Sequence, residues 1–289
     1  MDRNNDDDDE DGNRRSVIDK NILDHIIMSI EREYHVICSK LYNFYGGWNR
    51  YPRSWWQTQI GSINGIWLDS NGVLYFADTG NYVVRKVDVY GTNAVVNIFA
   101  GTLAISGDSG DYGPATTALF LNPFGICGLT NGVIYITDPS SSRIRSVIGG
   151  IISSVTGIPS TPLCIDGLPG IAGLSKPYLC RPDNNDNILI ADGDCNSIRL
   201  LNTQTNSLTT IIGSGTAGLV LDAWTNAQLN SPLGVFCCDA AGSIYIADSA
   251  NNGIRVQPPQ PTDSTYVVAG SSGGVSGSAT NTIGVLATF

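Results

Sequence analysis

The sequence predicts an all-β fold built from four repeated units, and three observations support this prediction. First, the 289-residue chain contains 33 glycines and only 15% charged residues, a composition typical of short strands joined by tight turns. Second, an aliphatic–aromatic segment that ends in Asp recurs four times along the chain. Third, an Arg follows each of these Asp residues at a constant distance, whereas the spacing between units varies, so the repeated segment is a defined structural element.

Residues 1–15 precede any predicted regular structure. They contain seven acidic residues and no apolar residue after Met1, so they cannot bury surface and we expect them to be disordered. This beginning is also the opposite of a signal peptide, which needs a basic start followed by an apolar run.

The next segment, residues 16–56, is predicted to form an amphipathic helix followed by a linker. Its apolar residues recur at spacings of three and four up to about residue 45, and Gly46 and Gly47 would end the helix. These apolar residues are Leu23, Ile26, Ile27, Ile30, Tyr34, Ile37, Cys38 and Leu41. We expect this helix to pack on the domain that follows it.

The linker is rich in aromatic residues, with seven between positions 42 and 56. Large aromatic side chains near Arg are typical of interface hot spots, and they are equally suited to cover the open end of a domain. We favour the covering role and keep a partner-binding site as the alternative. The candidate residues are Trp48, Tyr51, Trp55 and Trp56.

The remaining part of the chain, 57–289, divides into four units, 61–120, 121–175, 176–230 and 231–289. Each unit contains an opening strand, a turn, the repeated strand, a polar loop and two further strands. Four-stranded units in series predict the blades of a β-propeller, and a linear solenoid is the weaker alternative. The third unit opens with "KPYLCRP", without the glycine of the other units, so we expect its inner strand to be irregular.

The recurring Asp and Arg are predicted to close a hairpin in each unit. Across a hairpin with a four-residue loop, we expect residues seven apart to stand opposite each other and to form an ion pair. The Asp can also accept amide hydrogen bonds from the turn that it precedes. We favour this structural role over catalysis, because radial blades would not bring four copies together. The pairs are Asp78 and Arg85, Asp138 and Arg145, Asp192 and Arg199, and Asp248 and Arg255.

Two neighbouring segments carry a family resemblance. The stretches "FAGTLAISGDSGDYGPATTALFLNP" (99–123) and "NPFGICGLTNGVIYITDPSSSRIRSV" (122–147) resemble NHL repeats, and the resemblance extends over residues 61–289. It implies a β-propeller but says little about function, because the family includes both enzymes and binding modules. NHL propellers commonly have six blades. Four units therefore imply a small closed ring, an open arc covered by residues 16–56, or assembly with a second copy.

The enzymes that resemble this family use groups that the repeated region lacks. The amidating lyase holds zinc through His, and lactonase and strictosidine-synthase-like propellers use central acids that include Glu. No His follows His35 and no Glu follows Glu33 in this chain. We therefore expect a protein that is not an enzyme and needs no cofactor. The alternative is a propeller enzyme of the lactonase or strictosidine-synthase type, or a protein that binds a small ligand such as calcium.

Closely spaced Asp residues are the weak calcium candidates. Oxygen ligands at short spacing suit Ca²⁺, but none of these runs matches a complete calcium loop, and loop Asp residues more often bond their own turns. The candidates are Asp108, Asp111, Asp183, Asp186, Asp192 and Asp194. Three Asp residues also recur in the long loops between units, at positions 108, 166 and 222. We expect them to cap these loops, and the alternative is that they place a ring of negative charge on one face of the propeller.

The charge of the chain bears on its partners. The formal net charge is −10, and from residue 57 onward 15 Asp stand against eight basic residues. An acidic surface repels phosphate backbones, so we expect no nucleic acid, and no apolar stretch is long enough to predict a membrane span. The expected partner is another protein or another copy of this chain.

The cysteines are predicted to be reduced. An odd count of seven, without CxxC spacing, argues against a disulfide framework or a zinc site. We expect Cys127, Cys180 and Cys237, on the predicted inner strands, to be buried thiols. Together with the missing signal peptide, this predicts an intracellular, cytoplasmic location.

Overall fold

The computed structural model describes residues 59–89, 95–237, 242–260 and 262–270. The acidic segment 1–15 and the helix expected within residues 16–56 lie outside the described residues, as do Trp48, Tyr51, Trp55 and Trp56. The account below therefore concerns the region in which the sequence predicts four units.

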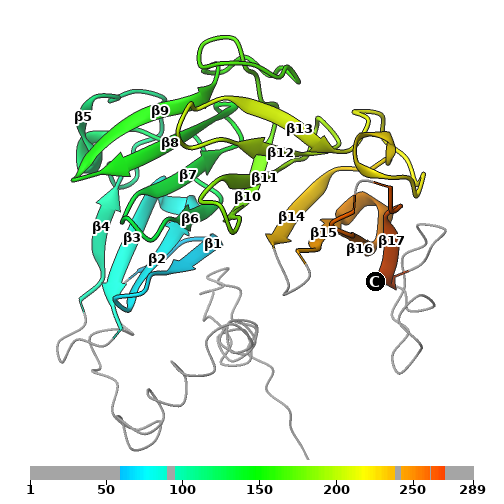
Figure 1. The fold of residues 1–289 in the computed structure, drawn as a ribbon. Helices are drawn as coiled ribbons and strands as arrows, with labels where there is room; N and C mark the ends of the chain where they lie inside the picture. The colour runs from blue at the N-terminus through cyan, green and yellow to red at the C-terminus, as the bar shows by residue number, and fades with distance from the viewer. Residues whose placement is uncertain (1–58, 90–94, 238–241, 261, 271–289) are drawn as a thin grey trace, which may run out of the picture. The chain divides into compact units, whose positions relative to one another are not determined.

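Four antiparallel sheets, one in each unit, confirm the four-bladed β-propeller (Figure 1). The first comprises β1 (Ile63–Leu68), β2 (Val73–Asp78), β3 (Val83–Asp88) and β4 (Asn97–Ala100). The second comprises β6 (Ile126–Gly128), β7 (Ile134–Asp138), β8 (Arg143–Ile148) and β9 (Ile151–Gly157), with β5 (Gly113–Pro114) added beside β9. The third comprises β10 (Pro177–Pro182), β11 (Ile188–Asp192), β12 (Ser197–Leu201) and β13 (Leu208–Ile212).

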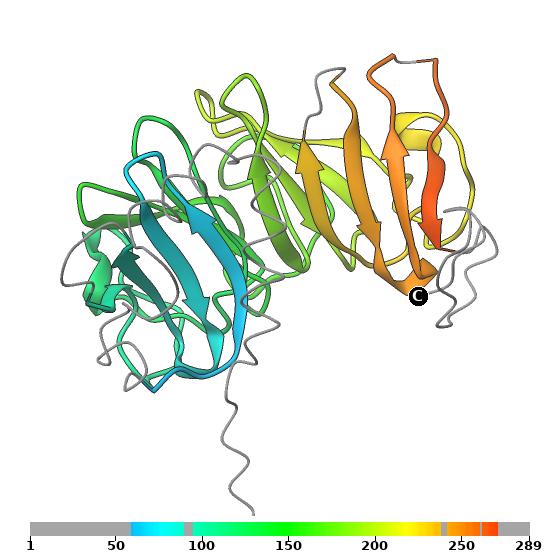
Figure 2. The ribbon, with the colours of Figure 1, turned by 90° about the horizontal axis from the view of Figure 1, so that it is seen from below.

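The fourth sheet, whose antiparallel arrows Figure 2 shows in orange, has its strands in sequence order. It comprises β14 (Pro232–Cys237), β15 (Ile244–Asp248), β16 (Gly253–Gln257) and β17 (Tyr266–Gly270). Short 3₁₀ helices lie in the connections: η2 (Thr79–Asn81), η3 (Ala115–Thr117), η4 (Trp224–Asn226) and η5 (Ser249–Asn251).

The hydrophobic core lies in layers between successive sheets. Ala77 and Val84 of the first sheet pack in one cluster with Ile134 and Ile136 of the second. A second cluster joins the second sheet to the third, and a third cluster joins the third to the fourth. Every residue of β7 and β11 is consequently buried, because a neighbouring blade covers each face. This explains why the repeated strands are largely aliphatic and aromatic instead of alternating with polar residues.

The innermost strands β1, β6, β10 and β14 contact one another in that order. The glycine of the opening strand permits this approach, since a Cβ on Gly65 would overlap the carbonyl oxygen of Phe124, and one on Gly125 that of Tyr178. The third blade has Leu179 at this position, and a Cβ built on Gly234 of the fourth blade would meet its Cδ1 at 3.5 Å. Among the described strands, no contact of similar extent joins β14 to β1.

The inner strand of the third blade is irregular, as expected, but two other inner strands share the irregularity. β10 has one register shift, between Pro177 and Cys180, but β1 and β14 have a corresponding shift near their own beginnings. The absence of glycine therefore does not make the third blade exceptional.

The predicted register of the repeated hairpin is also wrong. The Cα partner of Asp192 is Ser197, five residues later, and Arg199 faces Ile190. A four-residue loop pairs positions five apart, so the Arg lies on the same face as the Asp but displaced by two residues. The last loop residue takes the left-handed conformation in every blade: Tyr82, Ser142, Asn196 and Asn252 have φ between 48° and 59°.

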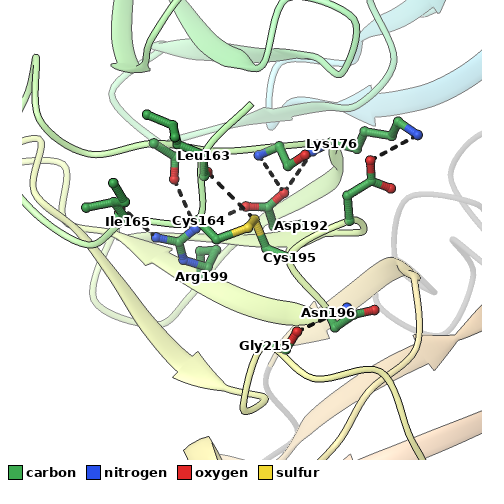
Figure 3. The surroundings of a disulfide bond; sticks show 12 residues. Leu163, Cys164, Ile165, Lys176, Asp192, Cys195, Asn196, Arg199 and Gly215 are labelled. Atoms are coloured by element: carbon green, nitrogen blue, oxygen red, sulfur yellow. Dashed lines mark hydrogen bonds and ion pairs between the residues drawn. A yellow bond between two sulfur atoms is a disulfide. The ribbon is translucent and has the colours of Figure 1, made fainter. Parts of the chain in front are cut away.

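Disulfide bonds contradict the prediction of reduced cysteines. Cys127 of the second blade is bonded to Cys180 on β10 of the third, with their Cα atoms 5.8 Å apart. Cys164 in the loop before β10 is bonded to Cys195 in the β11–β12 turn, as Figure 3 shows, with a Cα separation of 5.5 Å. Cys237 is disulfide-bonded as well. Sequence spacing could not reveal these bonds, because the bonded residues are 53 and 31 positions apart and meet only when the blades pack.

Candidate functional site

The repeated Asp and Arg form buried ion pairs in three of the four hairpins. Arg85 Nε lies 2.6 Å from Asp78 Oδ2, and Arg255 Nε lies 2.6 Å from Asp248 Oδ2. In the third blade, Arg199 Nη1 lies 3.0 Å from Asp192 Oδ2. The displaced register is compatible with these pairs, because the long Arg side chain reaches diagonally across the hairpin.

Each hairpin Asp also holds the chain where it enters its own blade. Asp78 accepts a hydrogen bond from the backbone N–H of Gly61 at 2.8 Å, and Asp248 accepts one from Asn230 at 2.7 Å. Asp192 accepts two, from Ser175 and Lys176, at 3.1 and 2.9 Å. One carboxylate therefore fixes both the hairpin and the entrance to the innermost strand, which is a structural function.

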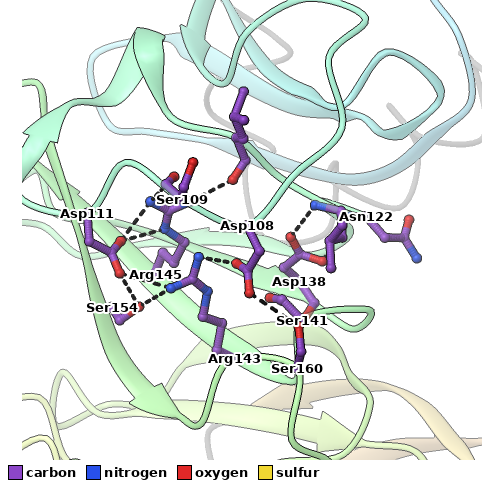
Figure 4. Close-up of polar contacts among 12 residues, drawn as sticks. Asp108, Ser109, Asp111, Asn122, Asp138, Ser141, Arg143, Arg145, Ser154 and Ser160 are labelled. Carbon is purple, nitrogen blue, oxygen red and sulfur yellow. Dashed lines mark hydrogen bonds and ion pairs between the residues drawn. The ribbon is translucent and has the colours of Figure 1, made fainter.

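The second blade departs from this pattern (Figure 4). Asp138 accepts backbone hydrogen bonds from Leu121 and Asn122, both at 2.9 Å, but no ion pair joins it to Arg145. Arg145 instead pairs with Asp111 at 2.7 Å. The Asp and Arg of this blade have the same spacing as the others, but its sequence differs at position 143, where an Arg stands in place of the Val83, Ser197 or Gly253 of the other units.

Arg143, a second arginine on β8, shares the carboxylate of Asp111 with Arg145. Arg143 also pairs with Asp111, at 2.9 Å, and with Asp108. Ser154 donates to Asp111 at 2.6 Å and completes the cluster. Asp108 and Asp111 thus bind the blade that follows their loop.

The Arg side chains tie the long loops between blades to the hairpins. Arg199 donates to the carbonyl oxygens of Ile165 and Gly173, both at 3.1 Å, and pairs with Asp166 at 2.8 Å. Arg255 donates to the carbonyls of Gly218 and Val220 at 3.3 Å. The expected capping role describes Asp222, whose carboxylate accepts the N–H of Ala223 in its own loop. Asp108 and Asp166 instead pair with Arg143 and Arg199 of the blade that follows each loop.

The pKa values of these carboxyl groups separate into two groups. Burial raises the pKa of Asp138 and Asp248, and it raises the pKa of Asp192 to about 6 despite the neighbouring Arg199. Burial would also raise the pKa of Asp111, but the Ser154 hydrogen bond and the charges of Arg145 and Arg143 outweigh it and lower that pKa. The pKa of Asp166 is likewise lowered, because hydrogen bonds from Thr210 and Arg199 outweigh its burial.

The calcium candidates do not converge. Asp183 accepts backbone hydrogen bonds from Asn185 and Asn187 in its own turn, and Asp194 pairs with Lys176 at 3.0 Å. Within the described ranges, no group of three or more His, Cys, Asp or Glu side chains is arranged to hold a metal ion.

A cavity of about 330 Å³ opens between the second and third blades. Tyr135, Ser146 and Ser153 line it from the second sheet, and Gln204 and Asn206 line it from the β12–β13 turn. Sequence reasoning missed these residues. The sequence signal was Ser146 and Ser153 in "RIRSVIGGIISSV", because the third unit has Leu200 and Thr209 at these two positions.

Within the part of the chain that the structure describes, no helix has the length and apolar character that crossing a bilayer requires.

Sequence comparison finds similarity to proteins with NHL repeats. The chain is 26% identical over 150 residues to NHL repeat-containing protein 2 of Bos taurus, covering 47% of this chain and 21% of the relative. It is 30% identical over 204 residues to Protein SUPPRESSOR OF QUENCHING 1, chloroplastic, of Arabidopsis thaliana, covering 65% of this chain and 19% of the relative. The chain thus spans about a fifth of the length of the curated relatives it matches. No protein-family model matches it.

Structural comparison supports the same fold. A protein of unknown function from Bacteroides thetaiotaomicron superimposes with a TM-score of 0.52 and 21% identity, covering 72% of this chain and 47% of that one. An auxiliary nutrient binding protein from Bacteroides ovatus gives a TM-score of 0.53 and 19% identity, covering 70% and 49%. Combined with the four sheets and their repeated Asp and Arg, these findings show a four-bladed β-propeller whose sequence is similar to that of proteins with NHL repeats.

Proposed function

We propose that this propeller is a binding module without enzymatic activity, and that it docks another protein on the loops between its blades. The observation that carries the proposal is the exposure of large apolar side chains on all three described loops. They are Leu103, Ile105 and Tyr112 on the first loop, Ile165, Leu168 and Ile171 on the second, and Val220 and Leu221 on the third. Exposed apolar residues concentrated on one class of element are typical of interaction surfaces.

The anchoring of these loops supports the same function. The second loop is held by Arg199, which donates to Ile165 and Gly173 within it, and by the Cys164–Cys195 disulfide. A loop that is already ordered loses less conformational entropy when it binds. The buried Asp and Arg residues would therefore serve binding indirectly, by presenting the loops in one conformation.

The chemistry of the repeated region favours binding over catalysis. Asp is its only acidic residue and His is missing from it, so a general acid or base would have to be an Asp carboxyl. The hairpin Asp residues are committed to backbone N–H groups and, in three blades, to Arg. The excess of Asp over basic residues also favours a protein partner over nucleic acid.

The test uses two double variants of the full chain. Leu168→Ser with Ile171→Ser removes apolar side chains that are 57% and 62% exposed on the second loop. Ile148→Ser with Ile151→Ser makes the same kind of change at the β8–β9 turn, where the side chains are 60% and 46% exposed. A partner recovered by affinity enrichment is purified and titrated by calorimetry against each protein. We expect the loop variant to bind at least about tenfold more weakly and the turn variant to bind normally. Equal affinity of all three proteins would refute docking on the loops.

A further inference from the structure

The cavity between the second and third blades is lined by hydroxyl groups on the second blade. Tyr135, Ser146 and Ser153 are cross-strand neighbours on β7, β8 and β9, so their side chains lie side by side on one face. The Tyr135 ring belongs, with Leu129 and Val155, to the apolar cluster shared with the third blade. The corresponding residues of the third blade are Leu189, Leu200 and Thr209, so only one of them carries a hydroxyl group.

Two hydroxyl groups face this cavity from residues that are otherwise buried. Tyr135 is 5% exposed and Ser146 is 8% exposed, and both line the cavity. Neither hydroxyl forms a hydrogen bond with the described residues, and neither is among the fully buried polar atoms, so both are accessible from the cavity. A ligand in the cavity could therefore form hydrogen bonds with both.

The opposite wall is an ordered turn that presents amide groups. Asn202 accepts backbone hydrogen bonds from Gln204 and Thr205, both at 3.0 Å, and Thr203 donates to the carbonyl of Asp186 at 2.8 Å. Gln204 and Asn206 line the cavity from this turn. Their side-chain amides can both donate and accept hydrogen bonds.

The lining defines the class of ligand. It contains hydroxyls, amides and short aliphatic side chains, and none of its residues is Asp, Glu, Lys, Arg or His. Its volume is at the lower end of the range for small-molecule sites. A neutral compound with several hydroxyl groups satisfies these donors and acceptors, whereas a phosphate or carboxylate would meet no cation. We propose that this cavity binds a neutral sugar of one or two residues, a function beyond the docking of a protein on the loops.

The test measures direct binding to the full-length protein. Saturation-transfer NMR is performed with glucose, galactose, N-acetylglucosamine and maltose as probes, and the strongest is titrated by calorimetry. We expect at least one probe to bind, and glucose 6-phosphate to bind no more tightly than glucose. The proposal is overturned if no probe binds at tens of millimolar concentration, or if the phosphorylated sugar alone binds.

Variants then locate the binding. Tyr135→Phe keeps the buried ring and removes only the hydroxyl, and we expect roughly five- to tenfold weaker binding. Ser146→Leu places in the second blade the residue found at position 200 of the third, so the fold should tolerate it while the side chain fills the cavity. Tyr75→Phe is the matched control, because Tyr75 has the position of Tyr135 in the first blade. Unchanged affinity in both cavity variants, or an equal loss in the Tyr75 variant, would place the sugar elsewhere.

Discussion

At the scale of single residues, the opening glycine separates blades that pack on a successor from the blade that does not. A Cβ on Gly125 would overlap the carbonyl oxygen of Tyr178 and lie 2.8 Å from Thr137 Oγ1. A Cβ on Gly234, in the fourth blade, would meet Ala247 and Leu179 at 3.5 Å, which is ordinary van der Waals contact. Close packing against the next blade thus requires glycine at position 125 but not at position 234.

We expect Gly125→Ala and Gly234→Ala to differ strongly in stability. The first forces two innermost strands apart and should lower the free energy of unfolding by about 1–3 kcal/mol. The second should change it by less than about 1 kcal/mol, since the Cβ fits and the unfolded chain loses entropy. Chemical denaturation of both variants measures the difference, and similar values for the two would contradict the close approach at Gly125.

Asp192 gives a prediction for the pH dependence of stability. Its pKa is raised to about 6 by burial, so the folded protein binds the proton more tightly than the unfolded chain does. The stabilisation from this group is present below the unfolded pKa of about 4 and is lost as pH rises through 6, by at most about 1.4 kcal/mol per pH unit. The difference in unfolding free energy between wild type and Asp192→Asn should therefore change between pH 4 and 6. A difference that stays constant over this range would show that the pKa of Asp192 is not raised.

At the scale of elements, local sequence predicts the strands and hairpins, but it does not predict the contacts that they make with distant parts of the chain. The four repeated strands and the three Asp–Arg ion pairs follow from local spacing. The pairing of Arg145 with Asp111 does not, because it depends on Arg143 and on a loop more than 30 residues earlier in the chain. The cavity at Tyr135 is equally inaccessible to sequence reasoning, since its second wall comes from another blade.

The disulfide between the second and third blades should contribute strongly to stability. It joins residues 53 positions apart, so removing it should lower the free energy of unfolding by about 2–5 kcal/mol. The variant is Cys127→Ser with Cys180→Ser, and denaturation without reductant measures the loss. Cys164→Ser with Cys195→Ser is the comparison, and the shorter separation of 31 should give a somewhat smaller loss. Wild-type stability in the first variant would contradict the bond.

The same bonds bear on the predicted cytoplasmic location, because disulfides rarely persist in a reducing compartment. Alkylation of free thiols at the moment of cell lysis, followed by peptide mapping without reduction, distinguishes the possibilities. We expect Cys127 and Cys180 to be recovered as a linked pair, which would favour an oxidising compartment. Recovery of both as alkylated thiols would instead support the cytoplasm.

At the scale of the whole molecule, the first and fourth sheets each have one face without a described neighbouring blade. In the first sheet, Ala77 and Val84 point toward the second blade, so Phe76 and Val87 lie on the opposite face, where they are buried in an apolar cluster with residues such as Ile63. In the fourth sheet, Ile254 and Tyr266 are 37% and 49% exposed. Apolar sheet faces of this kind are usually covered, by the same chain or by another.

We expect a second copy of the chain to cover the exposed face of the fourth sheet, so that the full-length protein is a dimer with about twice the chain mass of 30.7 kDa. Light scattering over a range of concentrations measures the mass. Ile254→Arg places a charge on the outer face of the fourth sheet and should produce monomers, because an unpaired charge is costly to bury. Ile171→Arg adds the same charge to a loop residue that is 62% exposed and should leave the dimer intact. A monomer at every concentration would mean that the chain covers this face itself, and dissociation by Ile171→Arg would move the interface to the loops.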